Sequence, residues 1–90
     1  MTISYSLEYE IEALKQLAKI PTKKAKRQLL GKIEQLENDP HPKGSKKLSC
    51  KISTFRLRSG RYRILYQVDS VEKIITITSI SDRKDVYRDF

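Results

Sequence analysis

The sequence has very few of the residues on which disulfide-bonded, metal-binding and membrane-spanning proteins depend. Of its 90 residues one is cysteine, one is histidine and none is tryptophan. A single cysteine, Cys50, excludes an internal disulfide and a zinc site built from several cysteines. No apolar run approaches the roughly 18 residues that a transmembrane helix needs, and no basic start followed by an apolar stretch marks a secretion signal. We therefore expect a soluble, cytoplasmic protein with no membrane partner.

The short length limits the chain to one hydrophobic core. A chain of this size buries only about 60–65 % of the surface that it exposes when unfolded, so an active site must lie on the surface or in a shallow groove. Hydrophobic residues make up 38 % and charged residues 33 %, a balance that still favours a globular fold over disorder. We predict a single domain over residues 1–90.

Positive charge is what the sequence has in excess. Nineteen lysines and arginines against eleven acidic residues give a net charge of +8. Residues 21–63 hold 13 of the basic and three of the acidic residues, whereas the segments before and after each carry a charge of −1. Clustered cations favour a polyanion such as nucleic acid, or an acidic protein. The alternative is a solvated helix face followed by lysine-rich turns.

Hydrophobic periodicity predicts a helical first half. Residues 3–7 alternate as in a short strand, and apolar residues then recur every three or four positions over residues 8–20 and 22–38. Pro21 ends the first helix, and Thr22 is suited to cap the second.

The second half has the period of strands. Residues 39–45 contain two prolines and a glycine and form a loop. Three runs rich in β-branched and aromatic residues follow, over 55–58, 62–68 and 74–78. The short breaks between them require antiparallel neighbours.

These elements predict an α+β fold. The N-terminal strand joins the meander as a four-stranded antiparallel sheet, and the two helices pack on one of its faces. The residues expected to be buried are Ile11, Leu14, Leu29, Ile33, Leu36, Ile64, Tyr66 and Ile77.

Four arginines surround the predicted hairpin at Gly60. Arg56 and Arg58 share one face of the first strand, and Arg61 and Arg63 share a face of the second. The planar guanidinium binds phosphate oxygens in pairs and keeps its charge when partly desolvated. Because no acidic residue interrupts this run, mutual repulsion favours an anion among the arginines. The alternative is a solubilising outer face of the sheet.

A second basic group follows the last strand. Tyr87 lies beside Arg83 and Arg88, and nearby positive charge lowers a phenol pKa and favours proton abstraction. Packing is the alternative role for this tyrosine. We expect His41 to be a solvated loop residue and Cys50 to fill a strand edge, so no metal site and no cofactor are predicted.

Three motifs together resemble a known family. They are Asn-Asp-Pro-x-Pro-x-Gly at residues 38–44 followed by Lys-Lys-Leu, Leu-Arg-x-Gly-x-Tyr-Arg-x-x-Tyr at residues 57–66, and Arg-x-Asp-Val-Tyr at residues 83–87. The whole chain resembles the RelE/ParE superfamily of bacterial and archaeal toxins, and the last motif is similar to its RelE branch.

The resemblance implies an endoribonuclease toxin that cleaves mRNA in the ribosomal A site without a metal. It also implies a cognate antitoxin, contacts with 16S ribosomal RNA, and operator DNA bound through the antitoxin. By position, Arg63 resembles the arginine that stabilises the phosphate, Tyr87 the proposed general base and Arg83 the C-terminal catalytic arginine. Arg56 replaces a family lysine as phosphate clamp, and Thr54 replaces a second one. The further residues assigned to RNA binding are Lys46, Lys47, Lys51, Arg58 and Arg61.

Two other functions stay open at this point. One is a gyrase inhibitor of the ParE type with the same fold, which has no need for Arg83 and Tyr87 beside Arg63. The other is an RNA- or protein-binding relative whose catalysis is weakened by Thr54.

Overall fold

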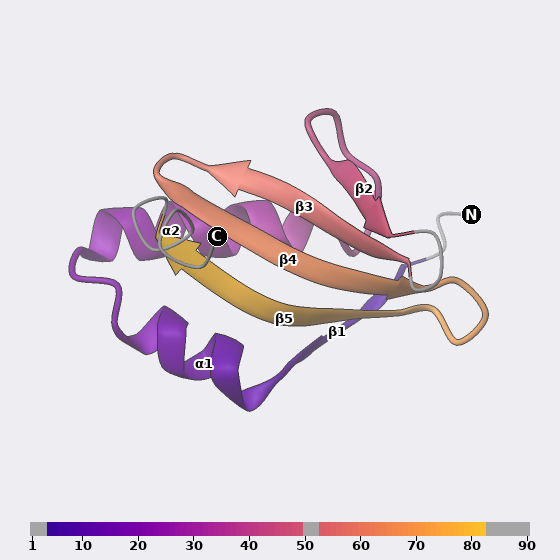
Figure 1. The fold of residues 1–90 in the computed structure, drawn as a ribbon, viewed down its shortest axis with the longest axis horizontal. Coiled ribbons are helices and arrows are strands. Elements are labelled where there is room, and N and C mark those ends of the chain that lie inside the picture. Colours follow the sequence, from indigo (N-terminus) through magenta and orange to yellow (C-terminus); the bar gives the residue numbers. More distant parts are fainter. Residues whose placement is uncertain (1–3, 50–52, 83–90) are drawn as a thin grey trace.

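The computed structural model describes residues 4–49 and 53–82, which form two helices and five strands (Figure 1). In chain order these elements are β1 (Ser6–Tyr9), α1 (Ile11–Ala18), α2 (Lys23–Gln35), β2 (Lys46–Ser49), β3 (Thr54–Ser59), β4 (Tyr62–Asp69) and β5 (Ile74–Asp82). The α+β class predicted from the sequence is confirmed.

The sheet is mixed, with the strand order β1-β5-β4-β3-β2. Strands β2 to β5 pair antiparallel, but β1 pairs parallel to β5, with Ser6 opposite Ile74. The prediction of a four-stranded antiparallel sheet is therefore wrong in two respects: the sheet has five strands, and β1 runs parallel to β5. No hairpin links β1 to β5, so connection length says nothing about their relative direction. The extra strand, β2, is a short edge strand that follows the proline-rich loop.

The hairpin between β3 and β4 has a two-residue loop, because Ser59 pairs with Tyr62. Gly60 begins this loop with a φ of 60°, the left-handed region that tight hairpins need and that glycine enters without strain. The loop fixes the register in which Arg58 lies opposite Arg63.

One face of the sheet carries the hydrophobic core. Alternate residues of β3, β4 and β5 are buried there against α2, whose Leu29 and Ile33 are fully covered. Figure 1 shows α2 crossing behind the sheet and α1 running beside β5. Burial is confirmed for six of the predicted core residues, Leu29, Ile33, Leu36, Ile64, Tyr66 and Ile77. Thr22 caps α2 as predicted, accepting the Ala25 N–H at 3.2 Å.

The prediction for the first helix is wrong about which side is buried. Ile11 is 72 % exposed and Leu14 is 48 % exposed, whereas Ala13 is fully buried. α1 packs beside β5 through Ala13 and the partly buried Leu17. A small alanine allows the helix to approach the strand closely, which turns Ile11 and Leu14 outward. Among the described residues, no helix is long and apolar enough to cross a membrane.

Candidate nucleic-acid interface

The second face of the sheet, opposite the core, is called the uncovered face because neither described helix lies over it; its side chains lie in three rows that cross the strands. The strand register defines each row, since residues opposite one another point to the same side. The arginine row contains Arg58, Arg63 and Ser81. The middle row contains Lys46, Arg56, Leu65 and Ser79. The polar row contains Thr54, Gln67, Thr76 and Glu8.

Three of the four predicted arginines lie together in the first two rows. Arg58 and Arg63 stand directly opposite each other on β3 and β4, and Arg56 lies two residues from Arg58 on the same side. Arg58 is exposed, while Arg56 and Arg63 are half-buried. Like charges placed opposite each other destabilise a sheet, and an anion between them removes that cost. The arrangement suits two or more oxygens of one phosphate.

The fourth arginine is placed differently. Arg61 belongs to the hairpin loop, and its guanidinium forms an ion pair with the Asp82 carboxylate at 2.9 Å. No acidic residue lies within the arginine run itself, but the sheet brings this carboxylate from the end of β5. The predicted mutual repulsion therefore overstated the charge at this end of the sheet, because Arg61 has an acidic partner.

The lysines assigned to RNA binding separate across the sheet edge. Lys46 pairs with Arg56 and joins the middle row, whereas Lys47 pairs with Phe55, a core residue. Alternation along β2 therefore places Lys47 on the opposite side from the arginines. Lys51, the third lysine, lies outside the described residues.

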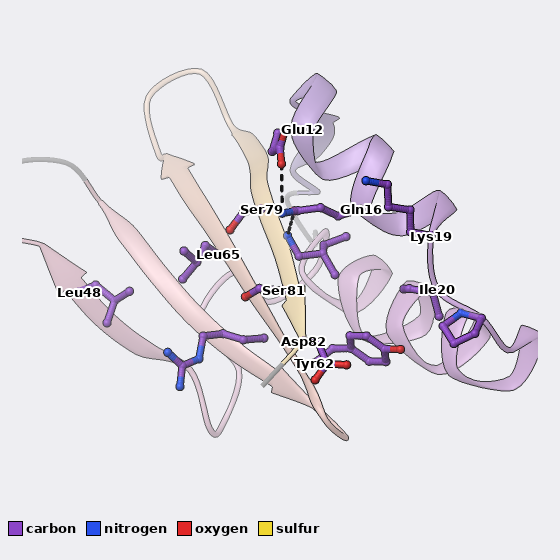
Figure 2. A pocket seen from close by; sticks show the side chains of 13 residues that line it. Glu12, Gln16, Lys19, Ile20, Leu48, Tyr62, Leu65, Ser79, Ser81 and Asp82 are labelled. Atoms are coloured by element: carbon purple, nitrogen blue, oxygen red, sulfur yellow. Dashed lines mark hydrogen bonds between the residues drawn. The ribbon is translucent and has the colours of Figure 1, made fainter. Parts of the chain in front are cut away.

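A hollow of about 710 Å³ extends the arginine row across β5 (Figure 2). The sheet contributes Arg63, Leu65 and Ser81, and the helical side contributes Gln16 and Lys19. Figure 2 shows Gln16 reaching from α1 to the strand. Of the three clustered arginines, Arg63 lines this hollow.

Gln16 holds α1 against the part of β5 that extends beyond the end of β1 and pairs only with β4. β1 ends opposite Ile77, so the Ile80 N–H beyond it lacks a ladder partner. The Gln16 side-chain oxygen accepts that N–H, and the Gln16 amide donates to the Glu12 carboxylate at 3.4 Å. The side chain thus replaces one strand hydrogen bond and fixes the edge of the hollow.

The proline-rich loop is anchored under the sheet by Tyr66. Its hydroxyl donates to the Pro40 carbonyl at 2.9 Å, and its ring stacks on Phe55. Burial raises the pKa of Tyr66, and the nearby Asp39 carboxylate raises it further, against an opposing hydrogen bond with Ser45. The phenol therefore stays neutral at ordinary pH and serves as a structural donor.

Two further predictions from the sequence concern His41 and Cys50. His41 is exposed, and its ring also lies 4.6 Å from that of Phe55, so it packs on the core edge as well as meeting solvent. Cys50 lies outside the described residues, as do Arg83 and Tyr87. Within the described ranges, no group of three histidine, cysteine, aspartate or glutamate side chains is placed to hold a metal ion.

The polar row was not predicted from the sequence, because Thr54, Gln67 and Thr76 carry no charge. The same period of two that places Arg63 on the uncovered face also places Gln67 there, four residues later. Thr76 and Glu8 could not be added, because they reach this row only through the pairing of β1 with β5.

Comparison of the sequence and comparison of the fold with known proteins both find similarity to toxins. The family model described as the ParE toxin of the type II toxin–antitoxin system parDE matches residues 7–87. A curated Methanocaldococcus jannaschii protein, named as a candidate RelE1 toxin, is 30 % identical over 96 % of this chain and 98 % of its own length.

Two solved complexes of a RelE toxin with its RelB antitoxin share the fold. The toxin from Pyrococcus horikoshii is 30 % identical, with a TM-score of 0.79 over 92 % of this chain and 97 % of that one. The E. coli RelBE complex is 26 % identical, with a TM-score of 0.74 over 88 % of this chain and 96 % of that one.

Proposed function

Because this chain belongs to the ParE toxin family of type II toxin–antitoxin systems and is RelE-like within it, we propose that it is a metal-independent endoribonuclease. Its substrate is mRNA in the A site of a translating ribosome in the cytoplasm. The observation that carries the proposal is the cluster of Arg56, Arg58 and Arg63 on the uncovered face of the sheet.

In this mechanism the arginines stabilise charge as it develops. The 2′-hydroxyl of the RNA loses its proton to the phenolate form of Tyr87, and its oxygen attacks the adjacent phosphorus. The bond from phosphorus to the 5′-oxygen then breaks, the 5′-oxygen takes a proton from water, and a 2′,3′-cyclic phosphate remains. Arg63 and Arg56 bind the phosphate oxygens, whose negative charge is greatest in the transition state, where such stabilisation matters most. Arg83 assists from the C-terminal segment, which lies outside the described residues together with Tyr87.

The partner that we propose is a RelB-like antitoxin. Two of the similar structures are toxins solved with RelB antitoxins, and they match this chain over nearly its full length. Such an antitoxin would cover the basic face of this chain and carry the complex to operator DNA. The remaining RNA contacts are assigned to Lys46 and Arg58, which lie on the face of the cluster.

The test is primer extension on one message, with purified protein, in the presence and absence of translating ribosomes. We expect cuts in codon register that appear only with ribosomes. Cleavage of free RNA at the same positions, or no cleavage in either reaction, would contradict the proposal.

Arg63→Ala then separates catalysis from binding. We expect its single-turnover rate at saturating ribosome to fall about a hundredfold or more, with little loss of ribosome binding, because many other cations remain. Arg27→Ala removes an arginine from the exposed surface of α2 and serves as the matched control. Equal rates for the two variants would remove Arg63 from the mechanism.

Tyr87→Phe tests the proposed base. It keeps the aromatic ring but removes the proton acceptor, so we expect slower cleavage, unchanged binding and a flatter rise of rate with pH. A phenylalanine variant as fast as the parent would limit Tyr87 to packing.

Inhibition of gyrase is the second candidate, and the match to a family model described as a ParE toxin favours it. Adding the purified protein to a gyrase supercoiling reaction decides between the two. Inhibition of supercoiling without any ribosome-dependent cut would select this function.

A further inference from the structure

A second hollow, of about 550 Å³, lies on the same face of the sheet, away from the arginines. Its lining includes Glu8 of β1, Gln67 of β4 and Thr76 of β5, all members of the polar row. Asp69 lines it where β4 ends. Carboxylate, amide and hydroxyl groups therefore meet around one concave surface.

This hollow lies at a defined distance from the arginine row. Gln67 follows Arg63 by four residues on the same strand, about 13 Å at the usual rise, and both point to the uncovered face. Leu65 lies between them, half-buried, and offers an apolar surface. An RNA strand that runs along β4 with a phosphate at Arg63 thus places a neighbouring nucleotide over Gln67.

The polar row is unsuited to a second phosphate. Glu8 is exposed, and its carboxylate would repel an anion. Asp69 adds another negative charge, although its Oδ1 already accepts the N–H groups of Val71 and Glu72, at 3.0 and 2.9 Å. A neutral polar group is the ligand that this end of the face favours.

The polar row has side-chain donors and acceptors that no other described residue occupies. Within residues 4–49 and 53–82, the side chains of Glu8, Thr54, Gln67 and Thr76 form no hydrogen bond or ion pair with another described residue. Three of them are half-buried in fixed strand positions, so binding costs little further side-chain ordering.

We propose that the polar row binds one RNA base beside the cleaved phosphate and selects the bases that carry an amino group (adenine, cytosine and guanine) over uracil. This inference rests on the proposed function, and it names the specificity-determining residues as Glu8, Gln67 and Thr76.

The selection follows from what each base presents. Adenine, cytosine and guanine each carry an exocyclic amino group, and unstacked RNA bases are read on their Watson–Crick and Hoogsteen edges. The Glu8 carboxylate accepts from the amino group, and Gln67 can both donate and accept beside it. Uracil has no amino group, and the two carbonyl oxygens that flank its ring N–H repel a carboxylate. Thr76 supplies a hydroxyl that suits either partner.

Glu8→Gln is the sharpest test, because it keeps the shape and adds a donor. Cleavage rates are measured on ribosomes programmed with four messages that differ only in the base beside the cut, with each codon position varied in turn. We expect the parent to prefer adenine, cytosine and guanine over uracil about tenfold at one position. In Glu8→Gln we expect that preference to fall to about twofold or less, through faster cleavage beside uracil. Glu72→Gln removes the same charge from the neighbouring turn and should leave the preference intact.

Gln67→Leu supplies a second, independent variant. It should slow cleavage beside adenine, cytosine or guanine about fivefold to tenfold, with Gln28→Leu on the exposed surface of α2 as its control. Circular dichroism and urea unfolding should match the parent, because Gln67 lies on the uncovered face.

The outcomes separate this inference from the function on which it rests. If the parent makes no ribosome-dependent cut, the proposed function fails. If the parent cuts but Glu8→Gln and Gln67→Leu keep its base preference, the polar row does not read a base and the inference is overturned. Loss of antitoxin affinity in these variants with an unchanged cut profile would likewise overturn it, in favour of a protein contact.

Discussion

Two glycines in this chain need opposite backbone conformations, so replacing each of them with alanine should change stability in opposite directions. Gly60 has a φ of 60° in the β3–β4 loop, whereas Gly31 lies inside α2. At neither position would an added Cβ meet another atom within 4 Å, so only the backbone decides the result. We expect Gly60→Ala to lower the free energy of unfolding by about 1–2 kcal/mol. Gly31→Ala should raise it by about 0.5–1 kcal/mol.

Urea unfolding of both variants measures the difference. Equal effects of the same sign would show that the loop is not held in the left-handed conformation.

The buried phenol of Tyr66 should make the folded protein less stable at alkaline pH. Burial raises the pKa of Tyr66, and it also raises the pKa of Tyr9, with the Glu34 and Glu37 carboxylates adding to the effect there. A pKa that is higher in the folded than in the unfolded state stabilises the protein below the unfolded value of about 10, and that stability is lost as pH rises through the folded value.

We expect the free energy of unfolding to stay level up to about pH 9 and to fall above about pH 10. Tyr66→Phe should be less stable at neutral pH by about 1 kcal/mol, because the Pro40 carbonyl loses its donor, and should show a smaller alkaline fall. Tyr9 accounts for the fall that remains. Urea titrations across this pH range supply the measurement, and an unchanged alkaline slope in Tyr66→Phe would contradict it.

At the scale of elements, the two helices differ in how much of their apolar surface they bury. Leu29 of α2 is fully buried, whereas Leu14 of α1 is 48 % exposed. We expect Leu29→Ala to cost about 2–5 kcal/mol of unfolding free energy, and Leu14→Ala less than about 1 kcal/mol. Thermal and urea unfolding of the pair test this. A large loss of unfolding free energy in Leu14→Ala would mean that, in solution, α1 turns the side that carries Leu14 toward the sheet.

The elements that sequence predicts well are those whose neighbours are close along the chain. The hairpins at Gly60 and after Asp69, and the helix capped by Thr22, follow from local turn and capping chemistry. The parallel pairing of β1 was not predictable in this way, since it depends on a distant strand. The prediction of which side of α1 is buried was also wrong, because hydrophobic periodicity identifies the apolar residues of a helix but not which of them lie closest to the sheet.

The candidate site shows the same division. Alternation along β3 and β4 was enough to place Arg56, Arg58 and Arg63 on one side. The ion pair of Arg61 with Asp82 required the register of β5, which the sequence does not reveal. The register between β4 and β5, which shifts between Leu65 and Tyr66, is therefore where inference about this site from the sequence ended.

At the scale of the whole molecule, a net charge of +8 governs encounters with partners. Electrostatic steering weakens as salt shortens the range of charge, so we expect association with an acidic antitoxin to slow several-fold between low and physiological ionic strength. Stopped-flow mixing at several salt concentrations measures the rate. An association rate that does not change with salt would show that charge does not guide this partner.

The pairing of β1 with β5 also has a consequence for synthesis. The first strand of the chain has no sheet partner until residues near Ile74 have been made and have left the exit channel of the ribosome. Pairing between such distant segments forms late, because the chain must first close a long loop. The sheet that carries the three rows is thus completed only after β5 has been made. An unfinished chain does not yet present the assembled face to the ribosome that is making it.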